Sequence, residues 1–157
     1  MIKCVEKEMQ VLNIYAPNVP RERRQFFGGL VDFSQDTQLP VVVAGDFNMV
    51  KSLPLDTEGS NNAKYHTRGI EELEVFQRKY SLVDVFRYKY PKKREFTWRN
   101  QTVKCRLDRI YCPERIAQKA TYTNILPNNF SDHEFMTTNV NLKKTRRGPG
   151  YWKLNCS

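Results

Sequence analysis

Short apolar runs separated by polar, turn-rich segments predict a series of strands. Residues 9–15 alternate in the rhythm of a β-strand, and the run ends at Ala16-Pro17 because the residue before a proline is pushed towards extended conformations. Residues 40–45 are almost wholly apolar and β-branched, which is typical of a strand covered on both faces. Two further strands are predicted near residues 120–126 and 135–142, with a polar loop at residues 127–133 between them.

Two other segments have the spacing of helices. Pro20 suits the first turn of one helix, with Asn18 as its cap, and apolar side chains follow at helical spacing up to Phe33. Residues 68–80 predict a second helix, whose inward side chains are expected to be Ile70, Leu73, Val75 and Phe76. Residues 47–67 are rich in Ser, Asn, Asp, Gly and Pro, and predict a long loop between the two.

A hairpin is predicted in the second half of the chain. Residues 95–99 and 102–112 both alternate and carry aromatic or β-branched side chains, and Asn100-Gln101 lies between them. In the second arm, Asp108 shares a face with Arg106 and Ile110. A shorter apolar segment precedes this hairpin at residues 82–86.

Length and composition predict one globular unit without a membrane segment. The chain has 157 residues, 39% of them hydrophobic, and no apolar run approaches the ~20 residues that span a bilayer. The first eight residues alternate charge and apolarity, which does not fit a secretory signal, so we expect an intracellular protein, nuclear or cytoplasmic and not secreted. Residues 1–142 form the expected domain, and residues 143–157, with Gly148-Pro149-Gly150, the expected basic linker tail.

Charge points to a polyanionic partner. The net charge is +9, and basic residues gather at positions 21–24, 92–94 and 143–147, a distribution that favours DNA or RNA. The four cysteines form no C-x-x-C pair and the chain has two histidines, so neither a structural zinc site nor a redox pair is indicated. Reduced, structural thiols are the expectation.

Three short acidic motifs carry the candidate chemistry: residues 45–48 (Gly-Asp-Phe-Asn), 106–109 (Arg-Leu-Asp-Arg) and 131–134 (Ser-Asp-His-Glu). Phosphodiester cleavage needs a positioned water and groups that hold developing negative charge. Asp46 can accept a proton from water, Asn48 can donate to a phosphate oxygen, and His133 can act as an acid or electrostatic catalyst once Asp108 orients it. Asp132 could reach a metal ion or the water.

The order of these motifs, with residues 13–17 (Asn-Ile-Tyr-Ala-Pro) ahead of them, resembles the endonuclease/exonuclease/phosphatase superfamily. The resemblance runs from about Val11 to Leu142. Residues 45–50, 82–87, 96–99 and 106–111 are similar to the endonuclease domain of LINE-type non-LTR retrotransposons, and residues 148–155 to the segment that leads towards the reverse transcriptase. This resemblance implies an α/β (α+β) fold, the C-terminal half of a four-layer α/β sandwich.

The resemblance also implies roles for six residues. Tyr15 would hydrogen-bond the scissile phosphate, Asp46 would position or deprotonate the attacking water, and Asn48 would hold a phosphate oxygen. Asp108 would orient His133, and Asp132 would assist with the metal or the water. The family uses Mg²⁺, with Mn²⁺ as an alternative, and oxygen ligands suit both ions.

One feature departs from the family pattern. Members carry an additional N-terminal half with an asparagine and a metal-binding glutamate, whereas here the strand that ends in Tyr15 begins almost at once. Glu6 and Glu8 do not match the context of that glutamate. We therefore expect a partial domain with an exposed apolar face and an unpaired edge, low stability when isolated, and a chain that is by itself inactive or only weakly active.

Three functions follow as hypotheses. The first is a Mg²⁺-dependent DNA endonuclease that nicks one strand to prime reverse transcription, in a polyprotein with the missing half and a downstream reverse transcriptase. The second is a catalytically dead fragment that binds nucleic acid. The third is a phosphatase of the same superfamily. The sequence leaves Arg106 and Arg109 open as salt-bridge partners or phosphate contacts, and Trp98 as a packed aromatic or a DNA wedge.

Overall fold

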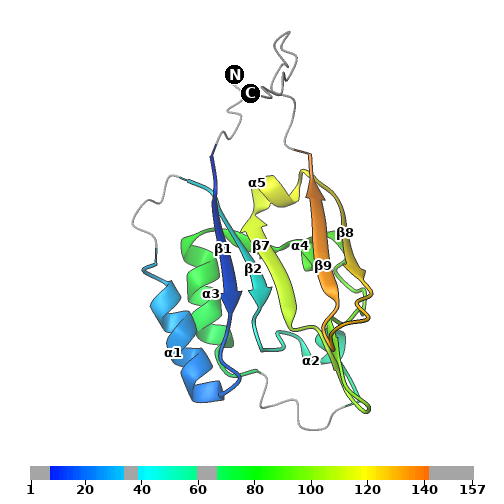
Figure 1. Cartoon of the computed structure of the whole chain (residues 1–157). Coiled ribbons are helices and arrows are strands. Elements are labelled where there is room, and N and C mark those ends of the chain that lie inside the picture. The colour runs from blue at the N-terminus through cyan, green and yellow to red at the C-terminus, as the bar shows by residue number, and fades with distance from the viewer. Residues whose placement is uncertain (1–7, 34–38, 60–66, 142–157) are drawn as a thin grey trace, which may run out of the picture.

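The computed structural model describes residues 8–33, 39–59 and 67–141, and its centre is a four-stranded sheet in the order β1-β2-β7-β4 (Figure 1). Strand β1 (Gln10–Tyr15) runs parallel to β2 (Val41–Asp46). Strand β7 (Asp108–Pro113) lies antiparallel to β2, and the short strand β4 (Leu82–Asp84) pairs with the other side of β7. The first two predicted strands are therefore present within one residue of their expected ends.

Helices α1 (Pro20–Leu30) and α3 (Ile70–Lys79) supply the apolar core on one face of this sheet. Phe27 from α1 and Phe76 from α3 are fully buried among side chains of β1, β2 and β7. The ring of Phe47, which follows β2, stacks on Phe27 and meets Tyr111 edge-on. This aromatic packing holds the segment after β2 against the helices.

Two details of the predicted helices are wrong. The residue that caps α1 is Val19, with no side-chain hydrogen bond, because Pro20 itself begins the helix and leaves Asn18 one position too early. Val75 is 43% exposed, since the inward face of α3 is set by Leu73 and Phe76, which lie three residues apart.

A second, three-stranded sheet has the order β3-β6-β5. The predicted hairpin is present as β5 (Trp98–Arg99) and β6 (Lys104–Cys105), and the Asn100 side chain closes its turn by accepting from two backbone amides. Strand β3 (Thr57–Glu58) and the one-turn helix α2 (Leu53–Asp56) interrupt the predicted long loop.

The second arm of that hairpin does not stay one strand. It leaves the three-stranded sheet after β6 and enters the central sheet as β7, with Arg106 and Leu107 buried at the crossing. The guanidinium of Arg106 bonds to Asp56 of α2 at the point where the chain passes from the three-stranded sheet to the central sheet. Asp108 and Ile110 share a face as predicted, but Arg106 precedes the strand.

A two-stranded ribbon completes the described chain. The short helices α4 (Val85–Lys89) and α5 (Glu114–Ala117) follow β4 and β7, and then β8 (Ala120–Leu126) pairs antiparallel with β9 (Phe135–Val140). Strand β9 lies beside β7 in Figure 1. Residues 143–157, assigned to a tail, lie outside the described residues, so that assignment stays a prediction.

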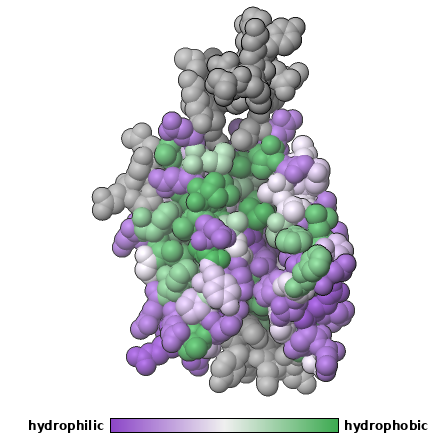
Figure 2. Space-filling view, in the orientation of Figure 1, coloured by the Kyte–Doolittle hydropathy of each residue, from purple (hydrophilic) through white to green (hydrophobic). Residues whose placement is uncertain are grey.

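The face of the central sheet away from α1 and α3 is only partly covered. In β2, Val41 and Val43 are buried on the helix side, whereas Val42 and Ala44 on the other side are half-buried. Val42 packs there against a second, smaller core that includes Val85 and Cys112, so the expected cover on both faces is complete on one and partial on the other. Val11 of β1 is 68% exposed. Figure 2 shows hydrophobic side chains over this face.

Two further observations concern the cysteines and the length of the helices. Cys105 and Cys112 are buried free thiols, and burial raises the pKa of Cys105 to about 11, so this thiol stays protonated at neutral pH. Within the described ranges, no helix has both the length and the apolarity to cross a bilayer.

Candidate active site

Three candidate residues form a row across the central sheet. Tyr15 of β1 is the register partner of Asp46 at the end of β2, and Asp46 is the partner of Asp108 at the start of β7. Side chains of directly paired residues project from the same face of a sheet. Strand pairing therefore brings together residues that lie 93 positions apart in the chain.

Gly45 is required for this row. Its φ is +134°, and a Cβ atom at this position would lie 2.0 Å from the carbonyl oxygen of Ile14, its partner on β1. Only glycine allows the two backbones to approach so closely immediately before Asp46.

Asn48 fixes the turn that follows Asp46. Its φ is +46°, in the left-handed region that asparagine tolerates better than most residues. Its backbone N–H donates to Asp46 Oδ1 at 2.8 Å, and its side-chain Nδ2 donates to the carbonyl of Ala16 at 2.7 Å. Asn48 thus joins the ends of β1 and β2 and orients the Asp46 carboxylate.

His133 lies between the two aspartates. Its Nδ1 is 2.9 Å from Asp108 Oδ2, and its Nε2 is 4.0 Å from Asp46 Oδ2. When Nδ1–H donates to the Asp108 carboxylate, Nε2 is the ring nitrogen that faces Asp46. The hydrogen bond to Asp108 therefore leaves Nε2 facing the second carboxylate, and the catalytic roles of both residues stay predictions.

The surroundings of Asp46 change the pKa of its carboxyl group. Burial raises the pKa of this carboxyl and the negative charge of Asp108 adds to that rise, while the Asn48 amide, His133 and Arg109 act in the opposite direction. A carboxylate with a raised pKa is a better proton acceptor. One ligand atom each from Asp46, Asp108 and His133 lie within 4.8 Å of one another, so the three could hold a metal ion.

Thr97 holds the two halves of this site together. It is fully buried, its hydroxyl oxygen accepts from the amides of Leu107 at 3.0 Å and Asp108 at 2.9 Å, and its carbonyl accepts from Glu134 N at 2.7 Å. The next residue forms an isolated β-bridge with His133. One residue therefore fixes the backbone on both sides of the Asp108–His133 hydrogen bond.

Replacing Thr97 with valine should destabilise the protein by about 1–3 kcal/mol, because the buried amide of Leu107 and the partly buried amide of Asp108 would lose their acceptor. Valine keeps the shape of threonine, so packing stays nearly constant. Urea denaturation measures the change, and Thr97→Ser, which keeps the hydroxyl, is the matched control. Equal stability of the valine and serine variants would contradict a role for the hydroxyl.

Asp132 is placed differently from the other candidates. Its side chain is exposed, and Oδ2 accepts a 2.7 Å hydrogen bond from Trp98 Nε1, a bond that lowers the pKa of Asp132. It does not belong to the group formed by Asp46, Asp108 and His133. Trp98 is half-buried and tied to the loop that carries His133, in line with a packed aromatic.

Arg106 and Arg109 are structural ion-pair partners. Arg106 donates to Asp56 Oδ1 at 2.9 Å and lies 2.8 Å from Asp84, and Arg109 Nη2 is 3.4 Å from Asp56 Oδ2. All these side chains are at least nine-tenths buried. Burial alone would raise the pKa of Asp56, but the charges of Arg109 and Arg106 and hydrogen bonds from Arg106 and Arg87 hold it well below its usual range.

Sequence reasoning did not identify this ion cluster (Asp56, Asp84, Arg87, Arg106 and Arg109). The available signal was an acid inside the apolar run at residues 82–86 and two arginines that flank Leu107-Asp108. A buried acid requires a partner, but the partner of Asp56 lies 50 positions away.

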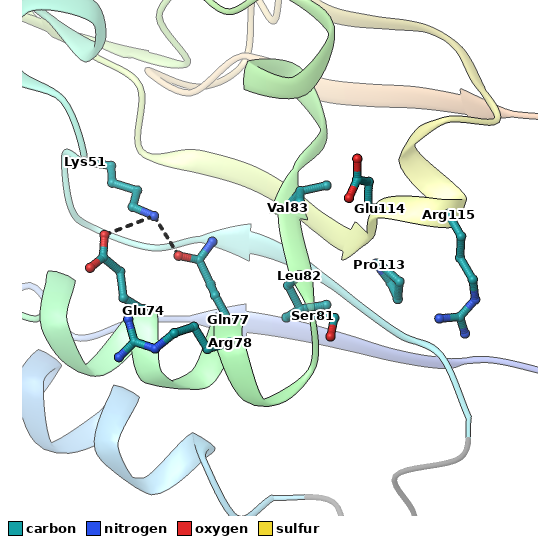
Figure 3. A pocket seen from close by; sticks show the side chains of 10 residues that line it. All are labelled: Lys51, Glu74, Gln77, Arg78, Ser81, Leu82, Val83, Pro113, Glu114 and Arg115. Carbon is teal, nitrogen blue, oxygen red and sulfur yellow. Dashed lines mark hydrogen bonds and ion pairs between the residues drawn. The ribbon is translucent and has the colours of Figure 1, made fainter.

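A cavity of about 570 Å³ lies elsewhere, between α3, β4 and α5 (Figure 3). None of the residues of the three acidic motifs lines it, and among its lining residues Lys51 pairs with Glu74 and donates to Gln77. The candidate chemistry of Asp46, Asp108 and His133 therefore lies outside this hollow.

Comparisons with known proteins support the fold. A 3'-5' exonuclease from Neisseria meningitidis (22% identity, TM-score 0.67) and an AP endonuclease from Archaeoglobus fulgidus (21%, TM-score 0.70) share the fold. Each match covers 83% of this chain and 60% of the solved chain, and at these identities it shows the fold alone. The predicted α/β sandwich class is confirmed.

Residues 9–133 match the model of the Endonuclease/Exonuclease/phosphatase family, so the chain belongs to this family. It is also 28% identical over 153 residues to an uncharacterized 149 kDa protein of transposon TX1 from Xenopus laevis, a match that covers 94% of this chain and 11% of that protein. The predicted family is confirmed. The chain spans about a tenth of the transposon protein and 60% of the two solved nucleases.

Proposed function

We propose that the chain is the catalytic part of a metal-dependent DNA endonuclease that nicks one strand, within a LINE-type retrotransposon polyprotein. The observation that carries the proposal is the convergence of Asp46, Asp108 and His133, whose ligand atoms lie within 4.8 Å of one another. Two carboxylates at the ends of the adjacent central strands β2 and β7, with an imidazole beside them, suit phosphodiester hydrolysis.

Each side chain has a task in this reaction. Asp46, whose pKa is raised by burial, accepts a proton from the attacking water. His133, oriented by Asp108, presents Nε2 to the reacting phosphate as acid or electrostatic catalyst. Tyr15 contacts a phosphate oxygen from the end of β1. Asn48 is 7% exposed and donates Nδ2 to the carbonyl of Ala16, so the second N–H of Nδ2 is its remaining donor to a phosphate oxygen. Asp132 assists the metal or the water from the edge of the site.

A divalent cation fits the donor set. The oxygens of Asp46 and Asp108 are adjacent and partly buried, and the charge of Asp108 raises the pKa of Asp46, so a cation between them would relieve their repulsion. Mg²⁺ or Mn²⁺ suits such oxygen ligands, and Asp132 is a further candidate ligand. When bound, the ion supplies Lewis-acid stabilisation of negative charge on the phosphate oxygens.

DNA is the proposed partner because the net charge of +9 favours a polyanion. A 3' phosphatase from Neisseria that shares the fold (20% identity, TM-score 0.69) was solved with a product DNA hairpin. We further propose a nuclear or cytoplasmic location, and a longer product that supplies the rest of the sandwich and a reverse transcriptase.

Conversion of supercoiled plasmid to nicked circles tests the proposal. The polyprotein that contains this chain should nick in Mg²⁺ and stop in EDTA, and the 157-residue chain alone should nick more slowly, because its sheet face is partly uncovered. Salt-sensitive DNA binding without nicking would favour the inactive fragment. Release of phosphate from 3'-phosphorylated DNA or inositol phosphates, without nicking, would favour a phosphatase.

A further inference from the structure

One aromatic side chain near the site is almost fully in water. Phe130 is 99% exposed, the largest exposed fraction among the large hydrophobic side chains of the described ranges. Solvation of a phenylalanine is unfavourable compared with its burial. Contact between this ring and a partner would therefore be favourable.

The loop that carries Phe130 is held by its own hydrogen bonds. The amide of Phe130 donates to Asn128 Oδ1 at 3.0 Å, and the amide of Asn128 donates to Glu134 Oε2 at 2.5 Å. The amide of His133 donates to Ser131 Oγ at 3.0 Å, and Glu134 also pairs with Arg99 of β5. A built turn, anchored to the β5–β6 hairpin, thus presents the ring.

Phe130 lies close to the candidate reaction centre. It is three residues from His133, so their Cα atoms are at most about 11 Å apart whatever path the loop takes. Successive nucleotides of one strand lie about 3.4 Å apart along the DNA axis. The ring therefore reaches the nucleotides within about three steps of a phosphate held at His133.

The surroundings favour a nucleobase over a protein partner. The neighbours of Phe130 in the loop are the polar residues Asn129 and Ser131. In the ribbon, the paired residues Leu126 and Phe135 add exposed apolar surface, since their side chains are 45% and 58% exposed. Figure 2 shows hydrophobic side chains over this end of β8 and β9 beside polar ones. Three side chains offer a few hundred Å², well below the area of a stable protein interface of about 1,200 Å² or more.

We propose that Phe130 stacks on, or wedges against, a nucleobase next to the cleaved phosphodiester and so positions the strand at His133. This inference rests on the proposed function. Every base offers a π-face, so such a contact adds affinity without requiring a particular sequence. It also leaves the neighbouring base pair distorted, which exposes the phosphate to the site.

The test uses the 157-residue chain and a duplex that carries 2-aminopurine at successive positions, in EDTA so that no cleavage occurs. The wild-type chain should raise the fluorescence of a 2-aminopurine that the ring displaces from its neighbouring bases. Phe130→Ala should weaken binding about 5- to 150-fold by fluorescence anisotropy and abolish this rise. Phe130→Trp should retain both signals. Tyr88→Ala, which truncates an exposed aromatic on α4, is the matched control and should bind as the wild type does.

Wild-type affinity and fluorescence for Phe130→Ala would overturn the inference. The inference would also fail if Phe130→Ala abolished a dimer observed by light scattering and left DNA binding unchanged, since the ring would then contact a second copy. These readouts need no hydrolysis. A protein that shows the Phe130-dependent signals but never nicks plasmid would refute the endonuclease and leave the base contact standing.

Discussion

Replacing Asp56 with asparagine is expected to lower the free energy of unfolding by about 3–5 kcal/mol, because the change leaves buried arginines without their countercharge. Asp56 is 1% exposed and contacts Arg87, Arg106 and Arg109. Asparagine is nearly isosteric, so the loss reports charge and not volume. Urea denaturation at pH 7 gives the difference directly.

The effect should depend on pH with a definite sign. The folded-state pKa of Asp56 is held below its ordinary value, so its ionisation stabilises the fold above pH about 4 and this contribution fades as pH falls towards the folded pKa. The gap between wild type and Asp56→Asn should therefore narrow in acid. Asp32→Asn is the control, because Asp32 is 89% exposed in its pair with Lys79 and should cost at most about 1 kcal/mol. Equal losses at Asp56 and Asp32 would contradict the buried ion cluster.

Replacing Asp108 with asparagine should reduce plasmid nicking by about 10²- to 10⁴-fold, the usual worth of oriented acid–base catalysis. The carboxylate fixes the His133 ring through the 2.9 Å bond to Nδ1, and an amide can hold the wrong tautomer. Initial nicking rates at saturating Mg²⁺ measure the change, and metal-free DNA affinity should stay within a few-fold of wild type. Glu58→Gln, which neutralises a half-exposed carboxylate on β3, is the control and should nick normally. A mere twofold loss at Asp108 would exclude an orienting role.

The local part of the site could be predicted from the sequence. Apolar β-branched runs and the proline after Tyr15 define β1 and β2 because strand patterning is a local property. The motif residues at the strand ends were expected to meet because their order matches the family. The pairing of Asp108 with His133 follows the same resemblance.

The remainder depends on contacts between distant segments. No local pattern gives the register that aligns Tyr15 with Asp46 and Asp108, or the crossing at Arg106 that divides one predicted strand between two sheets. Thr97 looked like any strand threonine, although its hydroxyl serves two amides of β7 and the crossing. Such roles are set by tertiary hydrogen bonds, which residue type and spacing do not encode.

Asp132 illustrates the limit of a motif. It is adjacent to His133, yet Asp132 lies in a bend whereas His133 forms an isolated β-bridge with Trp98. The side chain of His133 reaches Asp108 while that of Asp132 reaches Trp98. That Asp132 assists the metal remains a proposal. Trp98→Phe removes the hydrogen bond to Asp132, so this variant, with a free Asp132 carboxylate, can be compared with the wild type.

The central claim is that Asp108 and His133 act as one unit at a single phosphodiester site. A double-mutant cycle on plasmid nicking tests it most directly, with Asp108→Asn, His133→Ala and the double variant measured in the polyprotein context. Residues that act together lose activity non-additively. We predict that the double variant is no slower than His133→Ala alone. Multiplicative losses, or full activity in His133→Ala, would contradict the account.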